Sequence, residues 1–229
     1  MARRDAPRGA GRLRRGRRHK LIFGIRQNDR EAHPSSLAQV NSANSERLTD
    51  LRKRTLHLPD GEADKRRTTL GLLPTGRRYR RAFEPGCSLG LMTRLLAERC
   101  DEVVAWDVSE TAVSRARERC RDLTGVEVCR GAVPASWPDG RFDLVVLSEI
   151  GYFLQEEELA RTLRLTVDAL VEDGIVLLCH WRHPVDGWAL DGEDVNAVFA
   201  SSPSLRVEGT HEADDFVAIM LSRPGAGAP

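Results

Sequence analysis

Two spacings of apolar residues organise the chain beyond its first sixty or so residues. Short, mostly apolar runs predict strands, and longer segments with apolar residues three or four positions apart predict helices. The predicted strands are 79–84, 102–107, 126–130, 142–148, 175–180, 205–211 and 216–222. The predicted helices are 62–73, 89–99, 110–123 and 156–171. Ser109 is expected to cap the third of these helices, whose buried face would hold Ala112, Val113, Ala116 and Cys120.

The order of these elements predicts the fold class. Strands alternate with helices through most of the region, which is typical of a parallel sheet with right-handed crossovers. The last two strands are separated only by residues 212–215, too few for a crossover helix, so they should pair as an antiparallel hairpin. We therefore expect an α/β, Rossmann-like, doubly wound sheet that is mostly parallel and ends in an antiparallel hairpin.

The domain organisation follows from where the regular pattern begins and ends. Residues 1–47 lack apolar periodicity and carry clusters of Arg, Gly, Ser and Asn, so they are expected to form a disordered basic extension. Residues 48–78 would form a linker and one helix. Residues 79–222 would form the ligand-binding domain, and residues 223–229 a flexible tail.

Charge is distributed unevenly along the chain. The formal net charge is only +1, yet residues 1–81 hold 22 Lys and Arg against 8 Asp and Glu, and residues 82–229 hold 13 against 26. A basic arm of this kind could bind nucleic acid, although a solvated tail without a specific partner is the commoner case. A nucleic-acid partner is therefore kept as the less favoured alternative.

Cysteine content and apolar run length bear on the compartment. The cysteines are odd in number and contain no Cys-x-x-Cys pair, which indicates neither a zinc site nor a disulfide framework: Cys87, Cys100, Cys120, Cys129 and Cys179. No apolar run approaches the length of a membrane span. We predict a cytoplasmic protein without a bound metal and without a membrane partner, and the oligomeric state stays open.

A glycine-rich segment between the first strand and the following helix indicates a ligand site. In an open α/β sheet this turn lies at the ligand crevice, and small residues let the backbone approach a cofactor. A dinucleotide fingerprint starting at Gly86 fails at Ser88 and Leu91. The acid-x-Gly-x-Gly-x-Gly pattern of S-adenosylmethionine (SAM) sites fits at Glu84, Gly86 and Gly90, with Ser88 in place of one glycine.

A carboxylate at the end of the second strand supports the same cofactor. Asp107 is expected to accept hydrogen bonds from the ribose hydroxyls, although it could instead cap the following helix. After the third strand, where many SAM sites hold an acid against the adenine, this chain has Ala132, so backbone groups of Ala132 and Val133 would have to serve. The predicted cofactor-binding residues are Glu84, Gly86, Cys87, Ser88, Gly90, Asp107, Ala132, Val133 and Ser148.

Residues 79–222 resemble the nodulation protein S (NodS)-like family of class I SAM-dependent methyltransferases. The resemblance rests on residues 79–88, 142–152 and 180–184. It implies the class I methyltransferase fold, SAM as methyl donor with S-adenosylhomocysteine (SAH) as product, and a small-molecule acceptor, with an amino-sugar or another amine as the leading guess. Relatives carry a Tyr-Glu-x-Arg-Lys-like segment that helps to close over the cofactor. Here residues 61–65 read Gly-Glu-Ala-Asp-Lys, which predicts an altered or absent lid.

The acceptor side is predicted at the ends of the fourth and fifth strands. Glu149 could orient an amine or take its proton, Tyr152 could pack against the reacting centre, and His180 has a suitable pKa for a base. Glu149 and Tyr152 each also have an ordinary structural explanation, as a solvent-exposed strand-end acid and as a core tyrosine. Trp181, Arg182 and His183 could complete an acceptor pocket.

Three other functional classes remain in view. An RNA- or DNA-directed methyltransferase would use the basic arm, but the Asp/Asn-Pro-Pro-Tyr motif of base-amine methylation is replaced by Ser-Glu-Ile-Gly at residues 148–151. An NAD(P)-dependent oxidoreductase is disfavoured by the glycine spacing. A noncatalytic SAM-binding relative is the third alternative.

Overall fold

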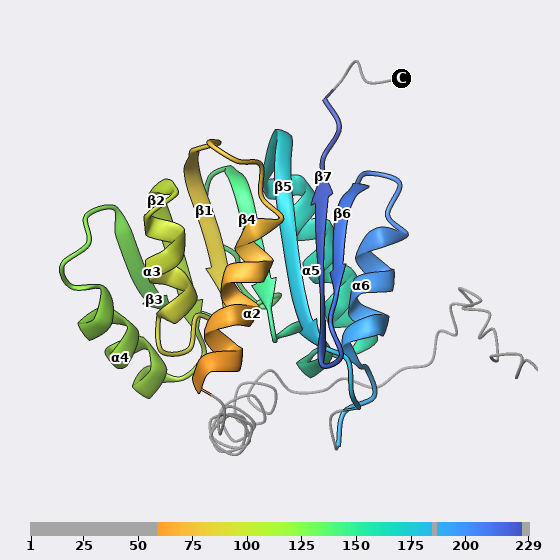
Figure 1. Cartoon of the computed structure of the whole chain (residues 1–229), viewed down its shortest axis with the longest axis horizontal. Coiled ribbons are helices and arrows are strands. Elements are labelled where there is room, and N and C mark those ends of the chain that lie inside the picture. Colours follow the sequence, from red (N-terminus) through yellow and green to blue (C-terminus); the bar gives the residue numbers. More distant parts are fainter. Residues whose placement is uncertain (1–58, 185–186, 226–229) are drawn as a thin grey trace, which may run out of the picture.

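The computed structural model describes residues 59–184 and 187–225, in which helices cover both faces of a seven-stranded sheet (Figure 1). The strands are β1 Tyr79–Pro85, β2 Cys100–Asp107, β3 Val126–Arg130, β4 Phe142–Ser148, β5 Leu170–Trp181, β6 Arg206–Glu212 and β7 Phe216–Ser222. The helices are α2 Pro59–Gly71, α3 Leu91–Ala97, α4 Glu110–Cys120, the short 3₁₀ helix η1 Gly151–Phe153, α5 Glu156–Ala169 and α6 Gly192–Ala200.

The strand order confirms the predicted fold. The sheet runs β3-β2-β1-β4-β5-β7-β6, with β1 to β5 parallel, β7 antiparallel to β5, and β6 antiparallel to β7. The chain proceeds outward from β1 to β3 and then returns to place β4 on the other side of β1. Such a reversal opens a crevice at the carboxyl ends of the two central strands. In Figure 1 the arrowheads of β1 and β4 point to the same edge of the sheet.

The core has two layers because alternate strand residues point to opposite faces. Leu144 and Val146 of β4 face the layer that contains α2 and α3, whereas Val145 and Leu147 face the layer that contains α5 and α6. Both faces of the central strands are therefore buried, which explains the continuous apolar run at residues 144–147. Figure 1 shows α2 and α3 in front of the sheet and α5 behind it.

Two segments differ most from the sequence prediction, whereas the bounds of several other elements shift by a few residues. Helix α5 ends at Ala169 rather than at 171, and β5 begins at Leu170. Asp173, near the start of β5, has a left-handed backbone conformation (φ 56°). Helix α6 was not predicted at all. Its start is fixed by a capping box in which Asp191 accepts from the Asp194 amide and Asp194 accepts from the Asp191 amide.

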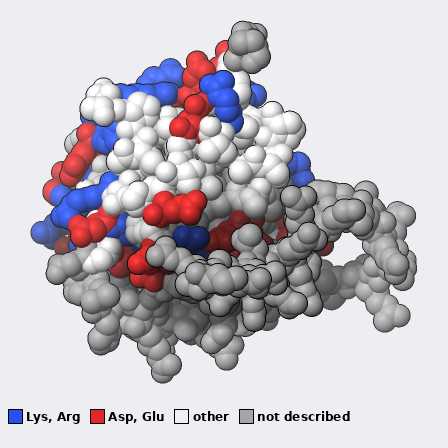
Figure 2. Space-filling model, turned by 45° about the vertical axis from the view of Figure 1, so that its right-hand side comes forward, with Lys and Arg blue, Asp and Glu red and all other residues white. Residues whose placement is uncertain are grey.

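The predictions for residues 1–47, for the first part of the linker (48–58) and for the last residues of the tail (226–229) lie outside the described residues. Within the described part, Lys and Arg side chains are interspersed with Asp and Glu on the face shown in Figure 2. All five cysteines are free thiols. None of the described helices is long and apolar enough to cross a bilayer.

Candidate active site

The loop after β1 turns sharply because three of its residues have left-handed backbone conformations. Gly86 has φ 79°, Ser88 φ 52° and Gly90 φ 73°. The amides of Gly86 and Cys87 both donate to the Trp106 carbonyl, at 2.7 and 2.9 Å, which ties the loop to the end of β2. Glycine adopts these conformations without steric cost, so the spacing of small residues in the motif follows from the turn itself.

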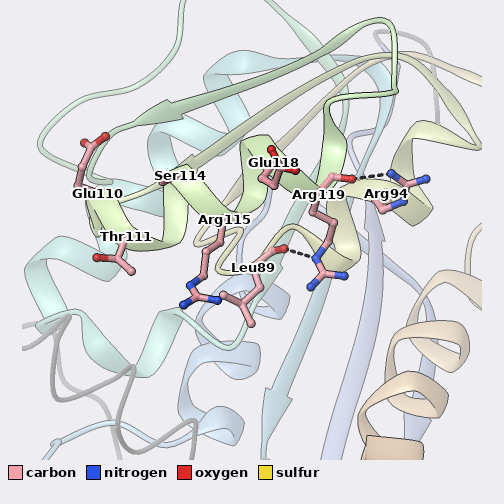
Figure 3. A pocket seen from close by; sticks show the side chains of 8 residues that line it. All are labelled: Leu89, Arg94, Glu110, Thr111, Ser114, Arg115, Glu118 and Arg119. Atoms are coloured by element: carbon pink, nitrogen blue, oxygen red, sulfur yellow. Dashed lines mark hydrogen bonds between the residues drawn. The ribbon is translucent and has the colours of Figure 1, made fainter.

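The third glycine of the motif serves the packing of α3 against α4. A Cβ built at Gly90 would lie 3.1 Å from the Cα and Cβ atoms of Ala116, so a larger residue would first push the two helices apart. On the outer side of this contact lies an open groove between the start of α3 and α4 (Figure 3). There Arg119 donates from Nε to the Leu89 carbonyl at 2.7 Å and braces the end of the loop (Figure 3).

Two motif side chains point into the protein. Cys87 is buried against Ala105 and Val113, and burial raises the pKa of its thiol, so its side chain is an inert packing group. Glu84 is buried at the end of β1, where its Oε2 accepts a hydrogen bond from Thr93 Oγ1 at 2.6 Å. Cys87 can therefore face a cofactor only through its backbone.

Asp107 is held in a geometry that suits a ribose. The residue is 8% exposed, and its two carboxylate oxygens accept the amides of Ser88 and Ser109, each at 2.9 Å. Each oxygen keeps a second lone pair that can accept a hydroxyl. The alternative role as a helix cap is taken by Ser109, whose hydroxyl accepts the Ala112 amide at 3.3 Å.

The segment after β3 offers fewer free backbone groups than expected. The Ala132 carbonyl accepts from both the amide and the hydroxyl of Ser136, at 2.8 and 3.2 Å. Val133 lies next to Ala132 and precedes a cis peptide bond to Pro134. The Ala132 carbonyl is thus already engaged within this segment.

Glu149 occupies the turn after β4, at the crevice predicted for the acceptor. Its backbone is left-handed (φ 58°), and its amide donates to the Cys179 carbonyl of β5 at 2.9 Å. Its carboxylate accepts from Lys65 Nζ at 3.1 Å and from the Tyr152 hydroxyl. Burial raises the pKa of the Glu149 carboxyl, but Lys65 and Tyr152 outweigh it and hold the pKa below its ordinary value.

The turns after β1 and β4 touch at the switch point of the sheet. A Cβ built at Gly86 would lie only 2.2 Å from Ile150 Cγ2, so glycine is required for this approach. Ser148 closes β4 just before this contact and pairs with Cys179 of β5. The predicted cofactor loop and the predicted acceptor residue Glu149 are therefore brought together.

His180 lies deeper than the sequence suggested. It is fully buried, its Nε2 accepts the Gly151 amide at 3.3 Å, and its Nδ1 lies 3.1 Å from Asn196 Oδ1. Because a backbone amide can only donate, Nε2 must be unprotonated and Nδ1 must carry the hydrogen. Burial lowers the pKa of the imidazole and keeps the ring neutral. Both ring nitrogens of His180 are thus engaged, Nε2 by the Gly151 amide at the start of η1 and Nδ1 by Asn196.

The residues that follow His180 form contacts with the hairpin and α6. Arg182 donates to Glu193 Oε1 at 2.9 Å and to the Ala213 carbonyl at 3.1 Å, and His183 Nε2 lies 2.9 Å from Asp215 Oδ1. Trp181 packs against His183, with ring centroids 4.9 Å apart. These side chains do cluster, but the polar groups of Arg182 and His183 are paired with Glu193 of α6 and with residues 213 and 215 of the hairpin turn.

Lys65 was missed by the sequence analysis and belongs to the site. The segment that departs from the Tyr-Glu-x-Arg-Lys pattern is helical and lies within α2, and the two residues that agree with the pattern, Glu62 and Lys65, form an ion pair of 2.6 Å. Lys65 then reaches Glu149 across the crevice. The agreement of Glu62 and Lys65 with the family pattern was the sequence signal that could have identified Lys65.

Comparison with known proteins now decides the class. The family profile described as "Methyltransferase domain" matches residues 82–174. The crystal structure of a proposed methyltransferase from Pseudomonas syringae is 40% identical, with a TM-score of 0.63, and the match covers 71% of this chain and 98% of that one. The chain belongs to the class I SAM-dependent methyltransferases.

Within that class the methyltransferase is NodS-like. Nodulation protein S of Bradyrhizobium diazoefficiens is 26% identical over 64% of this chain and 74% of its own length. The crystal structure of the N-methyltransferase NodS from Bradyrhizobium japonicum, in complex with SAH, shares the fold: its TM-score is 0.66 at 20% identity, covering 75% of this chain and 91% of that one. The resemblance inferred from the sequence is confirmed, and a dinucleotide oxidoreductase is set aside.

Proposed function

We propose that this methyltransferase methylates a small molecule, and that the acceptor is the amine of an amino sugar or a related small amine. The observation that carries the proposal is the Glu149 carboxylate, held by Lys65 and Tyr152 where the turn after β4 meets the glycine loop. A carboxylate accepts hydrogen bonds from an amine N–H, so it can aim the nitrogen lone pair at the methyl donor.

On the cofactor side, the proposed contacts are divided between backbone and side chains. The backbone of residues 86–90 would receive the methionine portion, Asp107 the ribose hydroxyls, and the backbone of Val133 the adenine. Glu84 and Ser148 would flank the methionine portion at the ends of β1 and β4. The geometry fits such a ligand, because Asp107 keeps free lone pairs and the glycine loop lies beside it.

On the acceptor side, the residues have orienting roles. SAM supplies a methyl group on a positively charged sulfur, which makes the methyl carbon reactive toward a lone pair. Glu149 would hold the amine N–H, Tyr152 would fix the Glu149 carboxylate, and His180 would hold η1 through the Gly151 amide. In-line displacement mainly needs such alignment, and strong acid catalysis is unnecessary.

The function is tested by measuring SAH release with several acceptor classes. We expect SAH to form from SAM in the presence of glucosamine or of another small amine from a panel, with the methyl group recovered on nitrogen. RNA and DNA are not expected to stimulate release. Methylation of RNA without methylation of any small amine would replace this proposal with the nucleic-acid alternative.

Glu149→Gln is expected to lower kcat by roughly tenfold, on the scale of one hydrogen bond to a charged group, and to leave SAH affinity unchanged. The lowered pKa of Glu149 keeps its carboxylate ionised at neutral pH, so the loss is expected on the plateau of the kcat profile, where the amine acceptor is already neutral. A loss above roughly 10²-fold that higher pH rescues would make Glu149 a general base instead. Glu157→Gln, which changes an exposed acid at the start of α5, is the control.

A further inference from the structure

Lys65 carries a positive charge from α2 into the methyl-transfer site. Its Nζ lies 2.6 Å from Glu62 Oε1 and 3.1 Å from Glu149 Oε1, and the residue is only 8% exposed. Glu62 belongs to the same helix, one turn earlier, whereas Glu149 belongs to the turn after β4. Lys65 thus joins α2 to the acceptor side of the crevice.

The charges around Glu149 balance only because Lys65 is present. Arg66 lies 3.5 Å from Glu62, so Arg66, Glu62, Lys65 and Glu149 form a neutral chain of two cations and two carboxylates. The other described groups that face Glu149 are Tyr152 on η1 and Cys179 and His180 on β5. Burial raises the pKa of Cys179 to about 12 and lowers that of His180, so neither adds charge at neutral pH.

Stability alone does not explain a buried ion pair at this place. Removing two charges from water costs about as much as their attraction returns, and apolar replacements are often as stable. Helix α2 already has apolar anchors, because Leu70 is buried in the same cluster as Met92 and Leu96 of α3. The pairing of Lys65 with Glu149 therefore calls for an explanation in the chemistry of the site.

The chemistry concerns the protonation state of the acceptor. An ammonium ion has no lone pair and cannot take a methyl group. A lone carboxylate nearby favours the ammonium form of an amine, and a nearby cation disfavours it. If the Glu149 carboxylate were not paired with a cation, the site would preferentially bind the ammonium form of the substrate, which cannot react.

We propose that Lys65 is a specificity-determining residue, which neutralises Glu149 so that the site takes a neutral amine and rejects the ammonium ion. The inference rests on the proposed amine acceptor. In the reaction, the nitrogen lone pair forms the new N–C bond, the S–C bond breaks with its electron pair left on sulfur, and the methylated ammonium product loses its proton to water. The same positive charge of Lys65 disfavours that cationic product and promotes its release.

The test compares kcat and KM for glucosamine over a range of pH at saturating SAM, in the full-length protein. Lys65→Met removes the charge at nearly constant length. We expect the acid limb of its kcat profile to move up by about one pH unit, which is about a tenfold loss of kcat on that limb, while KM falls or stays constant. The double variant Lys65→Met/Glu149→Gln, in which both charges are absent, should return the limb toward that of the wild type.

Two further variants separate charge from structure. Lys65→Arg keeps the charge and should keep the wild-type pH profile, and Arg67→Met removes an exposed charge from the same helix and should change nothing. SAH affinity of Lys65→Met should stay within about twofold of wild type. A uniform loss of kcat at every pH, or a loss of SAH affinity with an unshifted profile, would make Lys65 a structural residue and overturn the inference.

Failure of the inference and failure of the proposed function give different results. If the wild-type enzyme methylates glucosamine or another amine and Lys65→Met leaves the profile unshifted, only the inference is wrong. If the wild-type enzyme methylates no amine, the proposed acceptor class is wrong, and the inference falls with it.

Discussion

Asp107→Ala is expected to weaken SAH binding by about 10- to 100-fold, measured by calorimetry as a change in Kd. The substitution removes the two carboxylate oxygens that the proposed cofactor site offers to the ribose. It also leaves the amides of Ser88 and Ser109 without their acceptor, so the glycine loop loses part of its support. Both effects act in the same direction on affinity.

The control for Asp107 is Asp122→Ala, which removes an exposed carboxylate paired with Arg94 at 2.6 Å and should leave Kd unchanged. Asp107→Asn keeps one oxygen in place and should fall between wild type and Asp107→Ala. A folded Asp107→Ala protein that binds SAH as tightly as wild type would refute the ribose assignment.

Phe83→Ala is expected to lower the free energy of unfolding by about 3–5 kcal/mol. The Phe83 ring is fully buried and lies between three aromatic rings, with centroid distances of 5.5 Å to Trp106, 4.9 Å to Trp137 and 5.5 Å to Phe142. Removing the ring leaves a cavity that rigid neighbours cannot fill. Urea unfolding should show a lower midpoint with an unchanged slope.

Val207→Ala provides the comparison for Phe83, since Val207 is 43% exposed on β6 and should change the free energy of unfolding by less than about 0.5 kcal/mol. Phe83→Leu should have an intermediate effect because part of the volume is retained. Equal stability of Phe83→Ala and wild type would mean that this aromatic cluster does not hold the layers together.

The strands of the sheet could be predicted because buried strands consist mainly of apolar residues, which form recognisable runs in the sequence. Leu144, Val145, Val146 and Leu147 are all buried, so β4 reads as an unbroken apolar run. The boundary between α5 and β5 could not be placed, since Leu170 and Val171 suit either a helix or a strand. The extended backbone of Leu170 and the left-handed Asp173 show that the chain has already left the helix.

Helix α6 escaped prediction for a related reason. It is short and begins with Gly192, and of its residues only Val195 and Phe199 show helical apolar spacing on the buried side. The pair Asp191 and Asp194 was the one local signal of a helix start. A capping box built from two aspartates is easily taken for an acidic loop.

The cofactor side and the acceptor side of the candidate site differ in how many of their residues could be proposed from the sequence. The candidate cofactor side depends on local backbone turns, so spacing alone was enough to propose Gly86, Gly90 and Asp107 for it. The acceptor side depends on contacts distant in sequence, such as the pairing of Lys65 with Glu149 and of His180 with Asn196. A lysine in a polar helix and a histidine at a strand end have many ordinary explanations, and only the fold decides between them.

The position of β7 has a consequence for the order in which the sheet can be completed during synthesis. β7 lies between β5 and β6, so the outer edge of β5 has no partner until residues 216–222 have been made. An unpaired edge flanked by apolar residues is prone to pair with other chains. The growing polypeptide therefore exposes this edge of β5 for the time that the ribosome needs to add α6 and the hairpin, and slow codons within that interval should lower the yield of folded enzyme.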